Sequence, residues 1–144
     1  ETVFEAPGFE IPSISLTRFP FRGYHTSEDT PDLIDENALQ DTLQTTLAII
    51  DVLEQDITPR FRMKGLVALS HPKYNLYRAA IAPGLDREEY TSVNAKWNLL
   101  MNCLPRELDG KTPLLDIANR YELPLDQVYS YVNQWIKRGL ASCD

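Results

Sequence analysis

The 144-residue sequence predicts an α/β segment of one strand, a loop and a long helix, followed by a small helical domain. An alternating apolar run near residue 15 precedes a long repeat of helical period. The last third contains further helical repeats separated by short turns. We place the α/β part at residues 1–58, a strand with a linker or docking segment at 59–88, and the helical domain at 89–144.

Composition indicates a soluble globular protein, with 43% hydrophobic and 24% charged residues. No apolar run approaches the length needed to span a membrane, and no signal-peptide pattern is present, so we expect a cytoplasmic protein without a membrane partner. Cys103 and Cys143 have neither metal-ligand nor redox spacing. Two free thiols are therefore expected, with a disulfide as the alternative.

Charge is distributed unevenly along the chain. Residues 1–56 hold 12 acidic and 2 basic side chains, whereas residues 57–144 hold 9 acidic and 12 basic ones. The net charge thus changes from −10 to +3, which suggests two segments of different origin. The acidic segment is poorly suited to nucleic acid, whose phosphates repel it.

The first 56 residues predict the α/β elements in order. Residues 1–22 are rich in proline and extended, and Ile14-Ser15-Leu16-Thr17 alternates as a strand with one buried face does. A loop follows, and residues 32–36 supply capping and acidic residues for a helix at about 37–55. The apolar positions of that helix recur at helical spacing: Leu39, Leu43, Leu47, Ile50 and Leu53. One strand and one helix cannot bury so much apolar surface, so an upstream segment or another chain must cover it.

Residues 59–80 combine a strand pattern with a loop pattern. Phe61 and Met63 alternate with basic residues, which predicts a strand. The following residues have a loop pattern, because Pro72, Pro83 and Gly84 interrupt regular structure. His71, directly before Pro72, is expected to be a loop histidine.

The last third predicts three helices. Ser92 caps the first, Pro105 ends it, and one face carries its apolar residues, namely Val93, Trp97, Leu100 and Leu104. Asp109-Gly110 forms a turn, and Thr112-Pro113 caps and begins the second helix.

Pro124 begins the third helix and Gly139 stops it. Its aromatic residues have the spacing of core or interface positions: Tyr129, Tyr131 and Trp135. This order of a helix, a short turn, a longer helix and Gly-Leu resembles the helix-turn-helix core of a winged-helix domain.

The loop "GYHTSEDT", Gly23 to Thr30, follows the predicted strand, at the kind of edge where α/β folds bind ligands. Its run "HTSEDT" resembles the final metal-binding motif of the double-zinc aminopeptidases, His-Thr-x-x-Asp-Thr. The longer run "SISLTRFPFRGYHTSEDTPD" and the winged-helix pattern resemble a narrower group of bacterial aminopeptidase-like proteins. That group is associated with polysaccharide or natural-product biosynthesis. The resemblance is tightest at residues 11–56 and 93–140.

This resemblance implies that His25 is the last ligand of a site for two zinc ions. Asp29 would support that ligand or cap the following helix, and both roles stay open. The remaining ligands and the catalytic glutamate lie upstream in the family and are absent here, so no catalytic residue is assigned. One histidine cannot hold zinc, which takes about four ligands. We therefore expect this chain to be a C-terminal part, or to be completed by another chain, and to be no enzyme alone.

Other loop residues have weaker assignments. Tyr24, Arg18 and Arg22 could contact a substrate carboxylate or a tetrahedral intermediate. An arginine among so many acids is more often an ion-pair partner. On the motif alone, a histidine such as His25 is more often a surface or hydrogen-bonded residue than a metal ligand.

Three functions of different classes remain. The first is part of a zinc-dependent hydrolase that cleaves an amide bond in a peptide-like or small-molecule substrate. The second is a winged-helix DNA-binding protein, and the third is a non-catalytic scaffold. DNA is not expected, because Asp126 stands at the start of the third helix and residues 92–144 carry no net charge. Docking or homo-oligomerisation through the helical domain is expected instead.

Overall fold

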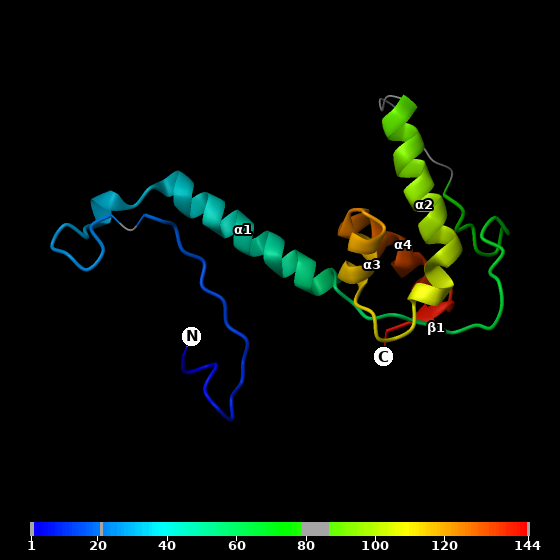
Figure 1. Ribbon diagram of the computed structural model, residues 1–144, viewed down its shortest axis with the longest axis horizontal. Coiled ribbons are helices and arrows are strands. Elements are labelled where there is room, and N and C mark those ends of the chain that lie inside the picture. The colour runs from blue at the N-terminus through cyan, green and yellow to red at the C-terminus, as the bar shows by residue number, and fades with distance from the viewer. Residues whose placement is uncertain (1, 21, 79–86, 144) are drawn as a thin grey trace. The chain divides into compact units, whose positions relative to one another are not determined.

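The computed structural model describes residues 2–20, 22–78 and 87–143 (Figure 1). It divides into two compact units, Glu1–Ala48 and Ile49–Asp144. The helices and strands are, in order, the 3₁₀ turn η1 (Pro31–Leu33), α1 (Glu36–Gln55), β1 (Arg60–Phe61), α2 (Arg87–Glu107), α3 (Leu114–Arg120), α4 (Leu125–Lys137) and β2 (Ala141–Ser142). The chain is thus mostly helical with a small two-stranded sheet.

The strand predicted at residues 14–17 does not form. These residues are extended but pair with no strand among the described residues. An alternating sequence creates a strand only where a neighbour satisfies its backbone hydrogen bonds. The described part of this unit offers no such neighbour, and that prediction is wrong for the chain by itself.

Helix α1 begins one residue before its predicted start and ends where predicted. The Asp35 Oδ1 atom accepts a hydrogen bond from the Asn37 backbone N–H at 2.9 Å, which caps the helix. The five apolar side chains of its predicted stripe are between 47% (Ile50) and 68% (Leu53) exposed. Within the described chain, α1 has no buried residue. The helix therefore forms without a core of its own.

The second unit has a closed hydrophobic core. Trp135 of α4 is fully buried, and Tyr131 packs edge-to-face between it and Trp97 of α2, at ring-centroid distances of 6.2 and 5.7 Å. Other core residues come from α2, α3 and α4, including Leu100, Leu104, Leu114, Ile117, Val128 and Val132. The placement of Tyr131 and Trp135 in this core confirms their predicted packing role.

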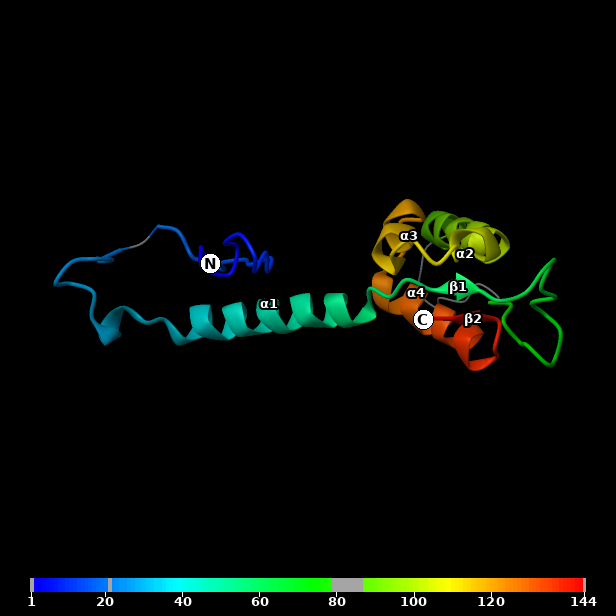
Figure 2. The same cartoon turned by 90° about the horizontal axis from the view of Figure 1, so that it is seen from below.

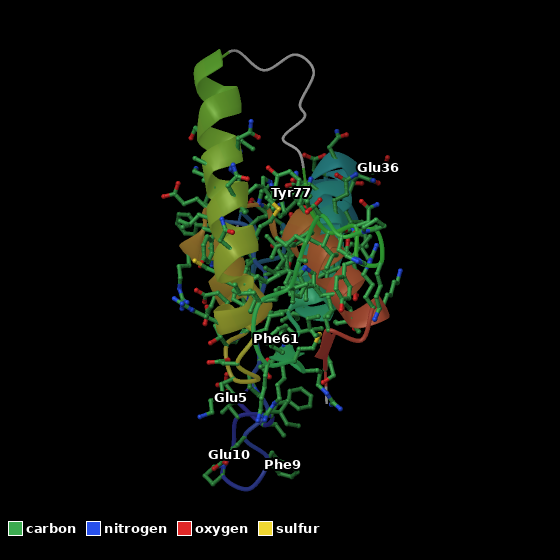
Figure 3. All side chains as sticks on the ribbon, turned by 90° about the vertical axis from the view of Figure 1, so that its right-hand side faces the viewer. Glu5, Phe9, Glu10, Glu36, Phe61 and Tyr77 are labelled. Carbon is green, nitrogen blue, oxygen red and sulfur yellow. The ribbon has the colours of Figure 1, made fainter. Side chains whose placement is uncertain are left out.

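The two strands lie side by side in the second unit (Figure 2). β1 and β2 are antiparallel, with Arg60 opposite Ser142 and Phe61 opposite Ala141. Phe61, labelled in Figure 3, packs edge-on to Trp135 at 6.1 Å between ring centroids. Its N–H donates to the Leu108 carbonyl at 2.7 Å. The predicted strand is thus present but limited to two residues.

Helix α2 differs from its prediction at both ends. It begins at Arg87, so Ser92 lies inside it rather than at its cap, and Pro105 stands two residues before its end. Proline removes one helical hydrogen bond, but Leu104 and Leu108 on either side of it are both buried. Burial of these side chains holds the last turn. Val93 is exposed, unlike the other predicted core positions of this helix.

The predicted α3 and α4 are confirmed, with corrections at their caps. Pro113 and Pro124 are the N-cap residues, and neither makes a side-chain cap hydrogen bond. The Thr112 hydroxyl instead donates to Asp109 Oδ2 at 3.2 Å. Gly139 ends α4 with φ of +70°, which allows the Leu140 N–H to reach the Trp135 carbonyl at 2.9 Å.

Residues 57–78 pack onto the second unit. Leu76 is buried in its core, and Val67, Leu69 and Tyr74 lie against it. The predicted docking segment is therefore part of this unit as far as residue 78, while Pro83 and Gly84 lie outside the described residues. None of the helices, over the described residues, is long and apolar enough to cross a membrane.

Candidate functional site

The loop from Gly23 to Thr30 is a compact series of turns. The Thr26 backbone N–H and hydroxyl both donate to the Gly23 carbonyl, at 3.0 and 2.6 Å. The Glu28 N–H then donates to Thr26 Oγ1 at 3.2 Å. Gly23 has φ of +75°, and a Cβ there would lie 2.8 Å from the Leu33 Cδ1 atom. Glycine is thus required where the loop begins, and Thr26 holds the loop closed.

His25 occupies an exposed position in this loop. Its backbone is left-handed, with φ of +61°, and its imidazole stacks on the Tyr24 ring at a centroid distance of 4.0 Å. Left-handed backbone is uncommon for residues other than glycine, although histidine adopts it more readily than most. The imidazole is exposed in this turn, and neutral imidazole is a common metal ligand.

Asp29 does not cap the following helix. Its carboxylate is exposed, and the cap of α1 is Asp35. The Asp29 backbone N–H donates to the Thr26 carbonyl at 3.2 Å, so the residue belongs to the same series of turns as His25. The capping alternative is therefore wrong for α1, and support of His25 stays a prediction.

The described residues do not form a complete metal site. They contain no group of three or more His, Cys, Asp or Glu side chains placed to hold a metal ion. A zinc ion bound by protein takes three or four such ligands. What this loop presents is the exposed imidazole of His25, which fits a single ligand position.

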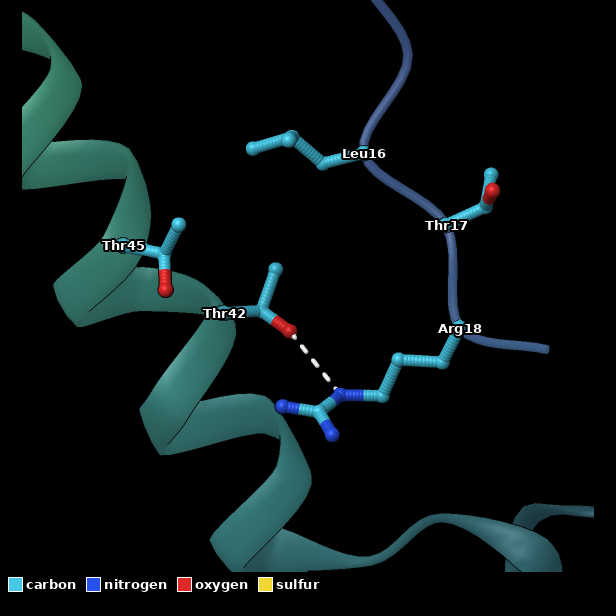
Figure 4. Close-up of a pocket in the computed structure, with 5 residues that line it drawn as sticks. All are labelled: Leu16, Thr17, Arg18, Thr42 and Thr45. Carbon is cyan, nitrogen blue, oxygen red and sulfur yellow. Dashed lines mark hydrogen bonds between the residues drawn. The ribbon is translucent and has the colours of Figure 1, made fainter.

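Arg18 is held by α1 within the first unit (Figure 4). Its guanidinium forms an ion pair with Asp41, and its Nε donates to Thr42 Oγ1 at 3.4 Å. A shallow pocket of about 240 Å³ lies beside this contact, lined also by Leu16, Thr17 and Thr45. The structure thus shows Arg18 as an ion-pair partner, which was the alternative to a substrate contact. The sequence contained no signal for Asp41 as the partner, because the two residues are 23 positions apart.

A second polar cluster joins α2 to the end of α3. The Tyr121 hydroxyl donates to Glu107 Oε1 at 2.8 Å, and Arg120 pairs with the other carboxylate oxygen. Burial, reinforced by the hydrogen bond to Glu107, raises the pKa of Tyr121 well above its usual range. All three side chains already have partners, so we assign them a structural role.

His71 makes a local contact, whereas Asp56 makes a long-range one. His71 Nδ1 accepts the Lys73 N–H at 3.1 Å, as expected for a loop histidine. Asp56 Oδ1 accepts the Leu115 N–H at 2.8 Å, so a residue directly after α1 caps α3 across 59 positions. Sequence reasoning missed this cap, because local patterns point only to Thr112.

Comparison with known proteins gives a consistent set of matches. A family described as a domain of unknown function, DUF4910, matches residues 1–56. A Clostridium acetobutylicum protein named "Putative polysaccharide biosynthesis protein with aminopeptidase-like domain" is 32% identical over 120 residues. Those residues are 82% of this chain and 26% of that protein.

A crystal structure of a "putative peptidase" from Clostridium acetobutylicum has a similar fold, with a TM-score of 0.55 and 23% identity. The match covers 99% of this chain and 29% of that structure. The chain thus spans about a quarter of the length of the curated relative it matches. It resembles the C-terminal part of an aminopeptidase-like protein, as the "HTSEDT" run and the helical pattern predicted.

Proposed function

We propose that this chain is the C-terminal portion of a zinc-dependent aminopeptidase-like hydrolase in which His25 is a zinc ligand. The observation that carries the proposal is the exposed imidazole of His25, held in a tight loop within the sequence "HTSEDT". Asp29, in the same turns, would support it. Zinc in hydrolases polarises a carbonyl and activates water, and two ions are expected in the complete protein.

The other metal ligands and the general base would come from an upstream part of the protein or from a second chain. The bare apolar face of α1 supports this, because it has the width and regularity of a face that packs on another element. Covering this face and completing the zinc site are thus two requirements that the same missing part would meet. Residues 1–144 alone are expected to show no hydrolase activity.

The proposed substrate class is based on the name of the Clostridium acetobutylicum relative. That relative is named for polysaccharide biosynthesis with an aminopeptidase-like domain. We accordingly propose that the complete protein cleaves an amide bond in a biosynthetic compound. The second unit, proposed to be a winged helix, would serve in docking or in association with a second copy.

The test compares the complete protein with its His25→Ala and His71→Ala variants. His71 is a matched control, because it is an exposed histidine whose Nδ1 serves only its own turn. Metal content is measured by elemental analysis, and amide hydrolysis with a panel of aminoacyl substrates. We expect His25→Ala alone to lose zinc and activity. Equal zinc in all three proteins would overturn the role of His25, and absence of zinc from the wild type would favour a scaffold.

DNA binding by the second unit is the alternative to a hydrolase function. The exposed face of α4 carries Asp126, Gln127, Ser130 and Gln134. A carboxylate at the start of this helix would face phosphate unfavourably. We therefore expect only weak duplex binding, no tighter than the non-specific range of roughly 10⁻⁴ to 10⁻⁶ M. A titration at low and moderate salt checks this, and tighter binding that salt abolishes would revive the DNA-binding function.

A further inference from the structure

A second pocket lies in the second unit, on the exposed face of α4. It has a volume of about 290 Å³ and is lined by Arg78, Asp126, Gln127, Ser130, Tyr131 and Gln134. That volume corresponds to about ten molecules of liquid water, which is small for a ligand site and suits a compound of dipeptide size. The residues that line it are polar or charged, apart from the ring of Tyr131, unlike the bare apolar face of α1.

Arg78 lines this pocket and is positioned by two contacts of its own and by one contact of the nearby Leu76. Its guanidinium lies over the Trp97 ring, 3.9 Å from the centroid, and its backbone N–H contacts the Met101 sulfur at 3.3 Å. Two residues earlier, the carbonyl of the buried Leu76 accepts the Tyr131 hydroxyl at 2.9 Å. The guanidinium thus packs on an aromatic face, while the residue itself is exposed.

The charge of Arg78 is not neutralised by a carboxylate within the described part of the chain. Arg18 and Arg120 form ion pairs with acidic side chains. Arg78 instead packs on the ring of Trp97. A preorganised guanidinium offers two parallel N–H groups, the geometry that a carboxylate accepts best. The pocket thus has one fixed site for an anionic group.

Asp126 restricts which anion can bind. A carboxylate in the same pocket repels a dianion such as phosphate, but it accepts hydrogen bonds from N–H groups on the ligand. The amides of Gln127 and Gln134, together with the Ser130 hydroxyl, can donate to and accept from a peptide group. These groups match a ligand that has a carboxylate next to amide or ammonium N–H groups.

We propose that this pocket binds the C-terminal carboxylate of a short peptide, with the carboxylate on Arg78 and the neighbouring N–H groups on Asp126 and the α4 amides. Binding here requires neither zinc nor hydrolysis, so its failure and the failure of the proposed function are distinguishable. The ligand is either a free short peptide or the C-terminus of a longer polypeptide, since both end in the same group.

The test is an NMR titration of the ¹⁵N-labelled 144-residue chain with L-alanyl-L-alanine. We expect saturable shifts of the Gln127 and Gln134 side-chain amides and of Arg78 Nε–H, with a dissociation constant on the order of 1 mM or tighter. The C-terminal amide of the same dipeptide should bind roughly tenfold more weakly or not at all, because it lacks the charge. Ala-Ala joined to the C-terminus of a folded carrier protein distinguishes the two sources.

Variants then test the roles of the two charged residues. Arg78→Gln should lose binding, Arg78→Lys should retain part of it, and Arg106→Gln, an exposed arginine at the end of α2, should leave it unchanged. If Arg78→Gln disturbs the Trp97 packing, Asp126→Asn gives an independent reading at an exposed position. We expect it to weaken dipeptide binding roughly threefold or more and to admit inorganic phosphate.

Three results would overturn the proposal. The first is the absence of saturable shifts with dipeptide in both the free and the carrier-linked form. The second is equal affinity for the dipeptide and its amide. The third is phosphate that binds the wild-type pocket as tightly as the dipeptide, which would make it a general anion site.

Discussion

The two units of this chain differ in what holds their helices. α1 is a 20-residue helix with no buried residue in the described chain, whereas α4, with 13 residues, buries Val128, Tyr131, Val132 and Trp135. Both sequences are amphipathic, so a helical pattern alone does not reveal whether its apolar face has a partner. The second unit thus carries its own core, whereas the apolar face of α1 is largely exposed in the described chain.

The largest effect is expected in the core of the second unit. Trp135→Ala removes a fully buried indole and should lower the free energy of unfolding by roughly 3–5 kcal/mol. That loss would unfold most of a marginally stable unit. Urea denaturation followed by near-ultraviolet circular dichroism measures it. A loss below about 1 kcal/mol would mean that the second unit lacks the tight core described above.

A charge in the α1 stripe should have different effects on stability in the 144-residue chain and in the complete protein. In the 144-residue chain, Leu47→Asp should change stability by no more than about 0.5 kcal/mol, because the side chain is already exposed. In the complete protein it should cost roughly 2–5 kcal/mol if this face is covered there. Thermal unfolding of both proteins makes the comparison.

The matched control for this test is Gln44→Asp, an exposed polar position of the same helix. It should be nearly neutral in both proteins. If Leu47→Asp were also neutral in the complete protein, no upstream part would cover α1 at this position.

A smaller effect is expected at the cap that Asp56 provides. Asp56→Ala leaves the Leu115 N–H without its acceptor and should cost about 1 kcal/mol. Glu54→Ala, an exposed acid of α1, is the control and should cost less. Chemical denaturation, together with hydrogen exchange at the Leu115 amide, measures the difference. Unchanged exchange in Asp56→Ala would show that this hydrogen bond does not hold α3.

The smallest expected effect is a pH dependence of the stability of the second unit, which arises from Asp109 in the turn before α3. The backbone N–H groups of Thr112 and Lys111 hold the pKa of Asp109 below its ordinary value of 3.8. A carboxyl with a depressed folded-state pKa stabilises the fold above the unfolded value, and this contribution disappears as the pH falls through the folded value. The second unit should thus lose stability below about pH 4.

Asp109→Asn should make the acid limb of that pH profile shallower than in the wild type. Asp116→Asn removes an equal charge from an exposed position of α3 and serves as the control. Denaturation midpoints between pH 2.5 and 6 compare the three proteins. Equal slopes for Asp109→Asn and the wild type would show that the turn does not depend on the charge of Asp109.

Local sequence patterns determined where the helices lie in this protein. Helical spacing of apolar residues, the capping residues before α1, and Gly139 after α4 act within a few positions, so α1, α3 and α4 were predictable nearly to the residue. The compact loop around His25 was also predictable as a turn, because the Thr26 side chain bonds to backbone groups two or three residues away.

Only the tertiary structure decided the contacts between distant residues. The strand at residues 14–17 fails because pairing needs a neighbour that no local pattern supplies. Arg18 with Asp41, Asp56 with the start of α3, and Arg78 over Trp97 join residues 19 to 59 positions apart. Such contacts depend on how the chain folds back on itself. A sequence that predicts each helix therefore leaves open which polar side chains are already paired and which, like His25, remain accessible to a ligand.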